Sequence, residues 1–257
     1  MPAEQELLIE QQGHVLTLQL NRPTRKNALT RSLCSQLLAA LAAAEREPTV
    51  RVIVLTGGQS AFCSGNDVAE FAAPPMPGDD PGLLFVRALA QCTKPVVAAV
   101  NGPAIGVGLA LLLHCDVVVI GESARLHAPF VTLGIGPQFG LSALLPRAVG
   151  QALAIDVLLC AQPLPPARAL AAGLVNAVVP DAETLAAARS RAVQIAAQAP
   201  GATRATKRLI KRWSVDQALA AIDAEAEEFV AARTRPETLE AVMAFIQKRP
   251  ADYSKFG

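Results

Sequence analysis

Two glycine-containing segments of the sequence could hold an anion on backbone amides. The first, Ala61–Val68, reads Ala-Phe-Cys-Ser-Gly-Asn-Asp-Val and follows a predicted strand, and the second, Asn101–Gly108, lies between a predicted strand and a predicted helix. Glycine lets a ligand approach the backbone, and the N-terminus of a helix favours negative charge. Similar turns are also common as plain structural punctuation, so either segment alone indicates a binding site only weakly.

Cofactor and metal sites find less support. The second segment has neither the Rossmann nor the Walker A spacing, which argues against a nucleotide cofactor. The five cysteines are widely separated, and no pair has CxxC spacing: Cys34, Cys63, Cys92, Cys115 and Cys160. We therefore expect no cofactor and no metal site, and we interpret the cysteines as reduced core thiols of a cytoplasmic protein.

Charge and hydropathy restrict the partners. The 23 basic and 22 acidic residues give a formal net charge of +1, which argues against nucleic acid as a partner. A basic run is interpreted as a solvated helix face, with a seat for phosphates or for RNA as the alternatives: Arg204, Lys207, Arg208, Lys211 and Arg212. Residues 1–10 lack the basic start of a signal peptide. The uncharged stretch 95–113 is interrupted by Asn101-Gly102-Pro103, so it predicts a buried strand, turn and helix rather than a membrane span.

The elements that must position the two segments alternate between strand and helix. Strands are predicted at 15–20, 50–56, 95–100 and 116–120, and helices are predicted from Thr30, at 68–71, at 83–91 and at 104–113. This alternation predicts an α/β fold with parallel strands. Beyond about residue 141 the pattern is mostly helical, apart from a strand at 174–179, with helices at 141–149, 152–159, 166–171, 183–198, 202–213, 215–233 and 236–248. We predict two parts, a core at 1–199 and a helical region at 200–257.

Several motifs together resemble one family over nearly the whole chain. They are Asn21-Arg22-Pro23 with Asn27-Ala28-Leu29, then 61–68, 94–102 and 172–175, and finally Ala244-Phe245 with Lys248-Arg249. In this order they resemble the enoyl-CoA hydratase/isomerase (crotonase) superfamily. Residues 64–67, 101–106, 127–130 and 133–134 are similar to its Δ3,Δ2-enoyl-CoA isomerase branch. The resemblance implies a β-β-α spiral core and a C-terminal all-helical region that forms trimers, or hexamers as dimers of trimers. Apolar positions there would then need partners: Leu219, Ile222, Phe229, Val242 and Phe245.

The resemblance also implies roles for particular residues. The substrate would be an acyl-CoA thioester, with coenzyme A present only as part of it. The backbone amides of Ser64 and Val107 would donate to the thioester oxygen as the α-carbon loses a proton. The residues that would bind the substrate are Lys26, Ala28, Ser64, Gly65, Asn66, Asp67, Val68 and Gly106. Lys255 and Phe256 would reach a neighbouring subunit's nucleotide.

The sequence departs from the family where protons are moved. Ala110 and Phe130 stand where hydratases have two glutamates, so hydration by two carboxylates is not expected. In the run 133–138 the isomerase pattern ends in a glutamate, but this chain has Gln138, an amide without a basic site. Asp67, Glu70 and His127 are alternative proton carriers, but each has a simpler interpretation. Asp67 would cap a helix or form an ion pair, Glu70 would face solvent, and His127 would be structural. Gln138 would instead position a water or a polar acyl group.

We therefore predict an enzyme on acyl-CoA in fatty acid metabolism, isomerase-like but without the usual glutamate base. Thioester hydrolysis, decarboxylation and non-catalytic acyl-CoA binding remain alternatives. Four phenylalanines lie near the two segments and would either line an acyl site or belong to the core: Phe62, Phe71, Phe130 and Phe139.

Overall fold

The computed structural model describes residues 5–58, 60–67, 70 and 80–256 of the chain. Its centre is a six-stranded sheet in the order β1-β2-β3-β4-β6-β8. β1 (Leu7–Gln12) is antiparallel to β2 (Val15–Leu20), whereas the other neighbouring strands are parallel: β3 (Val52–Thr56), β4 (Val96–Val100), β6 (Val117–Gly121) and β8 (Ala177–Val179).

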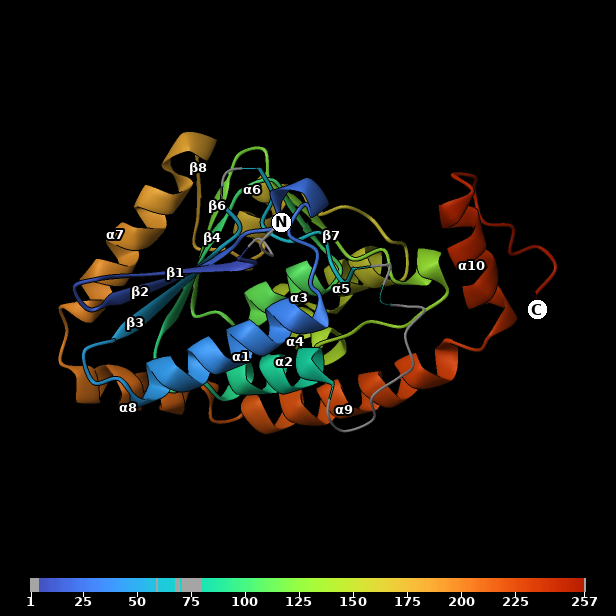
Figure 1. Cartoon of the computed structure of the whole chain (residues 1–257). Helices are drawn as coiled ribbons and strands as arrows, with labels where there is room; N and C mark the ends of the chain where they lie inside the picture. Colours follow the sequence, from blue (N-terminus) through green and yellow to red (C-terminus); the bar gives the residue numbers. More distant parts are fainter. Residues whose placement is uncertain (1–4, 59, 68–69, 71–79, 257) are drawn as a thin grey trace.

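Both faces of the sheet are covered by helices, as Figure 1 shows. β3 and β4 are buried at every residue, which is why they are continuous apolar runs rather than alternating ones. On one face, α7 (Thr184–Ala196) packs Ala188, Ala192 and Ala196 against Val54 and Val97. Alternate strand residues point the other way, into the larger core beneath the remaining helices.

A second set of short strand pairs runs beside the main sheet. β5 (Pro103–Ile105) is parallel to β7 (Arg125–His127), and parallel bridges join Leu29 to Asn66 and Cys63 to Ala104. Each turn of the chain passes from a main strand to a short strand and then to a helix. The helices reached in this way are α1 (Arg31–Arg46), α2 (Pro81–Gln91), α3 (Val107–His114) and α4 (Leu141–Val149). This confirms the predicted β-β-α spiral.

The second glycine-containing segment differs from its prediction. The helix predicted from Ala104 begins at Val107, because 103–105 forms β5 and Gly106 turns the chain with a φ of 56°. A strand of three residues is too short to show a periodicity of its own. β1 and β7 have no counterpart among the predicted elements, and the strand predicted at 174–179 is confined to 177–179. The helix predicted at 68–71 lies outside the described residues, except for residue 70.

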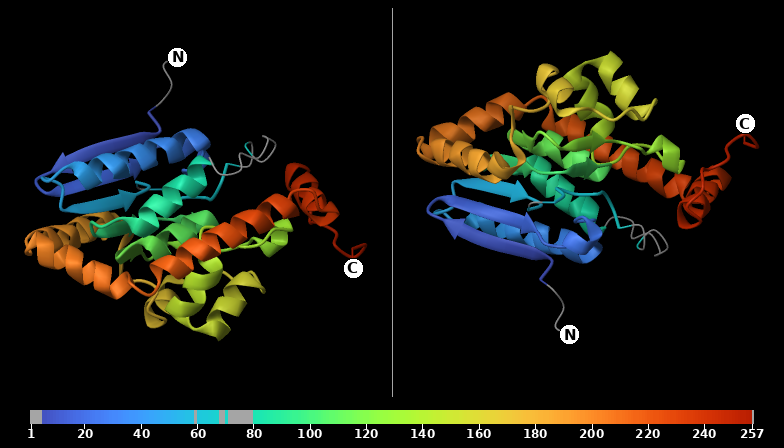
Figure 2. Two further views of the ribbon diagram at one scale, coloured as in Figure 1. Left: turned by 90° about the horizontal axis from the view of Figure 1, so that it is seen from below. Right: turned by 90° about the horizontal axis from the view of Figure 1, so that it is seen from above.

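The remainder of the chain is mostly helical, as predicted. The helices are α5 (Gln151–Leu158), α6 (Pro166–Ala171), α7, α8 (Pro200–Lys211), α9 (Val215–Ala232) and α10 (Pro236–Ile246), with short 3-10 helices η1 (Pro23–Arg25), η3 (Val131–Leu133) and η4 (Asp181–Glu183). α9 packs against α2 and α4, whereas α10 packs on η3 at the end of the molecule that holds the C-terminus (Figure 2). In the described part of the chain, each helix is too short or too polar to cross a membrane.

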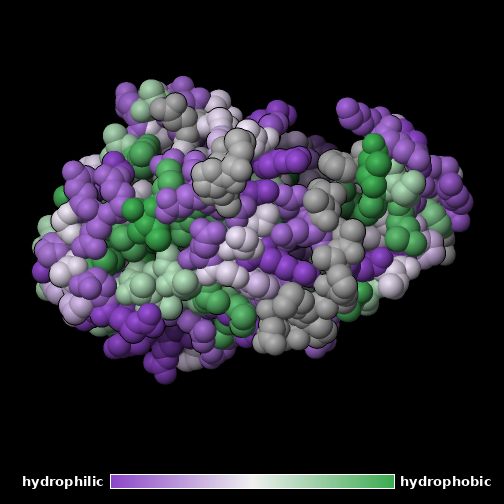
Figure 3. Space-filling view, in the orientation of Figure 1, coloured by the Kyte–Doolittle hydropathy of each residue, from purple (hydrophilic) through white to green (hydrophobic). Residues whose placement is uncertain are grey.

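The exposed apolar side chains of the C-terminal helices are not those that the sequence pattern marks. Ile222 is fully buried, and Leu219 and Phe229 pack against the molecule's own core. Apart from Val230 on α9, the exposed large apolar side chains of this region lie on α8, just after α8 and on α10: Leu209, Ile210, Trp213, Leu239, Met243 and Ile246. Figure 3 shows hydrophobic surface along α10. The Phe245 side chain lies outside the described part. The apolar surface in need of a partner is therefore displaced from α9 to its neighbours.

Candidate active site

In the first loop, the fold leaves the Asn66 backbone amide without an acceptor among the described residues. The Ser64 amide donates to the Lys26 carbonyl at 3.0 Å, and the Asp67 amide donates to the Leu29 carbonyl at 2.8 Å. Between them, the Asn66 amide donates to no atom of the described residues. The expected donor, Ser64, is thus already engaged in the short sheet. The amide that is available to a ligand is therefore that of Asn66, two residues after Ser64.

The second segment supplies an amide at the start of α3 that has no acceptor among the described residues. The Gly106 amide donates to the His127 carbonyl at 2.7 Å, and the Ala110 amide donates back to the Gly106 carbonyl at 3.2 Å. Val107 is the first residue of the helix, where an amide has no carbonyl within its own helix. This placement agrees with the expected role of Val107.

The two segments lie against each other. The Ile105 amide donates to the Cys63 carbonyl at 2.9 Å. A Cβ atom at Gly65, whose φ is +103°, would lie 3.3 Å from the Ile105 carbonyl oxygen, and one at Gly108 would lie 2.4 Å from the Cys63 carbonyl oxygen. Glycine at these two positions is therefore what lets the backbones meet.

A cavity of about 660 Å³ adjoins the first loop. Its walls come from the start of α1, from α2, from α9 and from the chain before α4. Apolar side chains make up part of the lining, among them Leu29, Leu83 and Ile222, and Asn66 and Gln138 contribute amides. Val107 is not among the lining residues, so the cavity opens beside Asn66 rather than between the two free amides.

Gln138 lies in this cavity wall and is 6% exposed. Asn66 donates from Nδ2 to Gln138 Oε1 at 3.0 Å, while Gln138 Nε2 is buried without a partner in the described residues. The next residue, Phe139, has a φ of 63°, and its carbonyl accepts from His114 Nε2 at 2.8 Å. Burial lowers the pKa of His114 to about 4, so the imidazole is neutral at pH 7 and carries its proton on Nε2.

The described residues thus place two backbone amides without acceptors on two contacting segments of a β-β-α spiral, with a cavity beside one of them, Asn66. The sequence from residue 10 to residue 255 matches the family model of enoyl-CoA hydratase/isomerase. The chain belongs to the enoyl-CoA hydratase/isomerase family.

Relatives within the family carry different activities. The chain is 37% identical over 251 residues to the 2,3-dehydroadipyl-CoA hydratase of Escherichia coli, covering 96% of this chain and 98% of that protein. It is 34% identical over 249 residues to the 1,2-epoxyphenylacetyl-CoA isomerase of the same bacterium, covering 93% and 95%. The solved structure of Pseudomonas aeruginosa OdaA is 42% identical with a TM-score of 0.91, covering 95% of this chain and 99% of that one. Hydratases and isomerases both occur among these relatives, and the isomerase branch stays a prediction.

The two positions at which the resemblance leads us to expect hydratase glutamates, Ala110 and Phe130, are apolar and buried. Ala110 is 0% exposed within α3, and Phe130 is 5% exposed with its ring 3.6 Å from where a Cβ atom on Gly106 would lie. Phe62 is also buried in the core, Phe139 lines the cavity, and Phe71 lies outside the described residues.

The alternative proton carriers have structural partners. Asp67 forms an ion pair with Arg22 at 2.9 Å, which confirms the simpler interpretation. His127 Nε2 lies 2.9 Å from the Ala161 carbonyl oxygen, which fits a structural histidine. The expectation that Glu70 faces solvent is wrong. Glu70 lines the cavity and accepts a hydrogen bond from the Arg31 amide at 2.9 Å.

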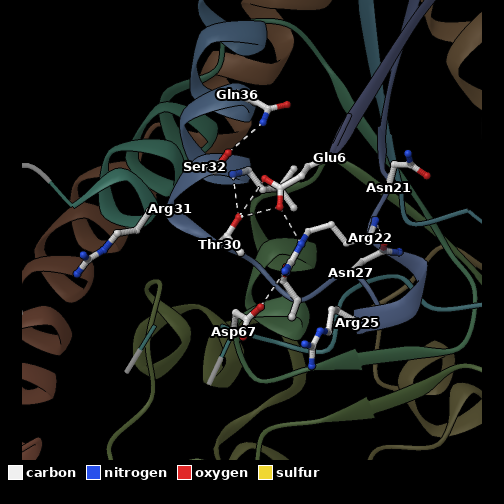
Figure 4. A network of polar contacts seen from close by, with 12 residues as sticks. Glu6, Asn21, Arg22, Arg25, Asn27, Thr30, Arg31, Ser32, Gln36 and Asp67 are labelled. Atoms are coloured by element: carbon white, nitrogen blue, oxygen red, sulfur yellow. Dashed lines mark hydrogen bonds and ion pairs between the residues drawn. The ribbon is translucent and has the colours of Figure 1, made fainter. Parts of the chain in front are cut away.

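Figure 4 shows a network of polar contacts behind the first loop, here called the polar frame, which the sequence motifs do not predict. Arg22 bonds to Asp67, to Glu6 at 2.8 Å and to the Ala28 carbonyl at 2.6 Å. Asn27 has a φ of 56°, and its Nδ2 donates to the carbonyls of Gly57 and Ala61 at 2.6 and 2.7 Å. The frame ties the turn after β2 to the loop after β3. The only sequence signal for these roles of Arg22 and Asn27 is that both residues belong to the first family motif.

The remaining predicted positions are scattered. Lys26 is exposed at the turn after η1, Ala28 is buried, and Val68 lies outside the described residues. In the basic run, Lys207 and Lys211 form ion pairs with Asp116 at 2.7 and 3.0 Å. These two lysines therefore hold α8 to β6 and are not available as a seat for phosphates. The role of Lys255 and Phe256 toward a neighbouring subunit stays a prediction.

Proposed function

We propose that this enzyme binds an acyl-CoA thioester and stabilises its enolate with the backbone amides of Asn66 and Val107. The observation that carries the proposal is the pair of amides without acceptors in the described part of the chain, on two segments in backbone contact. Asn66 replaces Ser64 in this role because the Ser64 amide donates to Lys26. Such donors act when they lie within hydrogen-bond reach of an oxygen that gains charge, and losing one typically costs about 10²–10³ in rate.

The chemical step follows from these donors. When the C–H bond at the α-carbon breaks, its electron pair delocalises onto the thioester oxygen, and two N–H groups stabilise the resulting charge. The proton needs an acceptor within hydrogen-bond reach. Gln138 occupies the slot of the isomerase base and cannot accept it. We infer an isomerase-like enzyme of fatty acid metabolism in which enolate stabilisation is retained and proton transfer is weakened or altered.

Hydration is the less favoured activity. Adding water across a double bond by the two-glutamate route of the family needs carboxylates at positions 110 and 130. An alanine and a phenylalanine, both buried, stand there. The hydratase names of several relatives therefore do not transfer to the chemistry of this chain.

An activity screen tests the proposal. Purified protein is offered 2-enoyl, 3-enoyl and 3-hydroxyacyl-CoA thioesters, and binding of each is measured in parallel by calorimetry. We expect binding of the thioesters and slow conversion of 3-enoyl-CoA. Binding without turnover of any thioester would favour a scaffold, and rapid hydration of 2-enoyl-CoA would overturn the isomerase assignment.

We further propose a homotrimer or a dimer of trimers, with α8 and α10 in the contacts. The support is their exposed apolar residues, such as Ile210 at 71% and Ile246 at 64%. Apolar surface of this kind is costly in water unless it is covered. Light scattering at micromolar concentration tests the assembly.

A further inference from the structure

The side-chain amide of Gln138 has a donor for which the described residues supply no acceptor. Asn66 Nδ2 donates to Gln138 Oε1, which orients the amide with its oxygen toward Asn66. Nε2 is then left buried and without a partner in the described residues. Native proteins rarely leave a buried amide nitrogen unpaired, and an absent ligand atom is one explanation of such a group.

The fold holds the backbone around Gln138 firmly. His114 donates to the Phe139 carbonyl, and Glu225 accepts from the Gly140 amide at 2.6 Å and from the Ser142 amide at 2.7 Å. Both His114 and Glu225 are buried. Non-glycine residues with positive φ, such as Phe139, persist where the surroundings fix them, and they concentrate at functional sites. The position of Gln138 is therefore imposed by its neighbours.

Gln138 also lies where a ligand would reach it. It lines the cavity together with apolar side chains such as Phe139 and Ile222. In an apolar pocket, a few placed polar groups fix the orientation of the ligand. The terminal torsion of glutamine is soft, so turning Nε2 toward a ligand in the cavity would need no change of backbone.

The charges of the cavity favour a neutral acceptor. Among the described residues, five carboxylates and three arginines line it: Asp67, Glu70, Asp80, Asp223 and Glu227, and Arg31, Arg87 and Arg233. One of the carboxylates, Asp67, is paired with Arg22 outside the cavity, which leaves the other four carboxylates against three arginines. Arg87 already forms an ion pair with Asp223. A carboxylate on the acyl chain would meet this excess of negative charge, whereas a hydroxyl or keto oxygen would not.

We propose that Gln138 donates from Nε2 to a neutral oxygen, hydroxyl or keto, carried by the acyl chain a few carbons from the thioester. Gln138 is then a specificity-determining residue for oxygen-bearing acyl groups. This rests on the proposed function, in which the Asn66 backbone amide donates to the thioester oxygen. The Gln138 side chain would then donate to a second oxygen, farther along the acyl chain.

Calorimetric binding of four thioesters tests the proposal: butyryl-CoA, 3-hydroxybutyryl-CoA, 3-oxobutyryl-CoA and succinyl-CoA. The proteins compared are wild type, Gln138→Met, which removes the donor at similar volume, and Gln162→Met, the same change at an exposed glutamine. Thermal melts check folding, and chromatography checks that each thioester is recovered unchanged.

We expect the wild type to bind at least one of the two neutral oxygen-bearing thioesters about five- to tenfold more tightly than butyryl-CoA, as one neutral hydrogen bond allows. Gln138→Met should weaken binding of the oxygen-bearing thioesters relative to butyryl-CoA by that same factor and so abolish the preference, while Gln162→Met should retain it. The two oxygen-bearing probes distinguish hydroxyl from keto, and succinyl-CoA should bind more weakly than either.

Two outcomes would overturn the inference in distinguishable ways. Equal binding of butyryl-CoA and both oxygen-bearing thioesters by the wild type, or an equal loss for all thioesters in Gln138→Met, removes the role of Gln138 and leaves the proposed function standing. Failure of the wild type to bind any of the four removes the proposed function and this inference with it.

Discussion

Gln138→Glu is the substitution that most directly probes the missing base. Gln138 is 6% exposed, and its Oε1 accepts from Asn66 Nδ2 at 3.0 Å. A glutamate has nearly the same shape and keeps that hydrogen bond. It would place a carboxylate in the cavity wall beside the proposed thioester site. Because desolvation disfavours the charged form, its pKa should lie above that of an ordinary glutamate, nearer to the pH at which a proton shuttle works best.

The expected gain can be bounded. General-base catalysis is typically worth about 10²–10⁴ in rate. A carboxyl with a pKa about one unit above the assay pH is ionised in roughly one molecule in ten, which reduces the lower end of that range to about tenfold. We therefore predict that the wild type is a poor Δ3,Δ2-enoyl-CoA isomerase and that Gln138→Glu raises the rate at least tenfold. Since the ionised form is the base, the rate of the variant should increase with pH.

The assay follows conversion of 3-enoyl-CoA to the conjugated 2-enoyl product by absorbance at several pH values. Gln162→Glu adds the same charge at an exposed position and should have no effect. Fast wild-type isomerisation that Gln138→Glu fails to improve would refute the reasoning. Another group would then be the base, and Glu70, which lines the cavity, would be the first to change.

Three further predictions follow from the packing. Gly65→Val should abolish thioester binding, because φ is +103° and the new Cβ would lie 3.3 Å from the Ile105 carbonyl oxygen. Cys63→Ala should weaken binding less than twofold. The opposite order in a binding assay would show that the site lies elsewhere. His114 has a folded pKa of about 4 against 6.5 ordinarily, so its stabilisation, up to about 3 kcal/mol, should be lost as pH falls from 6.5 toward 4. His114→Gln keeps a donor for the Phe139 carbonyl and should make the melting temperature depend less on pH between 6.5 and 4. A melting temperature that depends on pH as in the wild type would contradict the assignment. Light scattering should show a trimer or hexamer that Ile210→Glu weakens, since this side chain is 71% exposed, and a wild-type monomer at micromolar concentration would refute the assembly.

The sequence located the loops of the site better than the atoms within them. The motif at 61–68 marks the loop of the proposed site, but which amide lacks an acceptor depends on the hydrogen bond from Ser64 to Lys26, residues distant in sequence. No local pattern shows that pairing. Glu70 illustrates the same limit, because its direction is set by the Arg31 amide across the fold rather than by its own neighbours.

The fold was largely predictable because buried strands and amphipathic helices leave periodic patterns. β3 and β4 are apolar at every residue and were found within two residues of their ends. β5 and β7 have three residues each and exist through their pairing with each other, so the chain alone does not mark them. The direction of the C-terminal apolar residues also depends on tertiary packing, which is why Ile222 proved to be buried.

The central claim is that two backbone amides polarise the thioester oxygen. Infrared spectroscopy of butyryl-CoA labelled with ¹³C at the thioester carbonyl measures this directly, because donated hydrogen bonds weaken the C=O bond. Val107→Pro is the matched variant, since proline lacks the N–H and is tolerated at the first position of a helix. We predict a lower C=O stretching frequency for the thioester bound to wild type than for free thioester in water, with much of the shift lost in Val107→Pro. A bound thioester whose carbonyl frequency is unshifted from that in water would contradict the account.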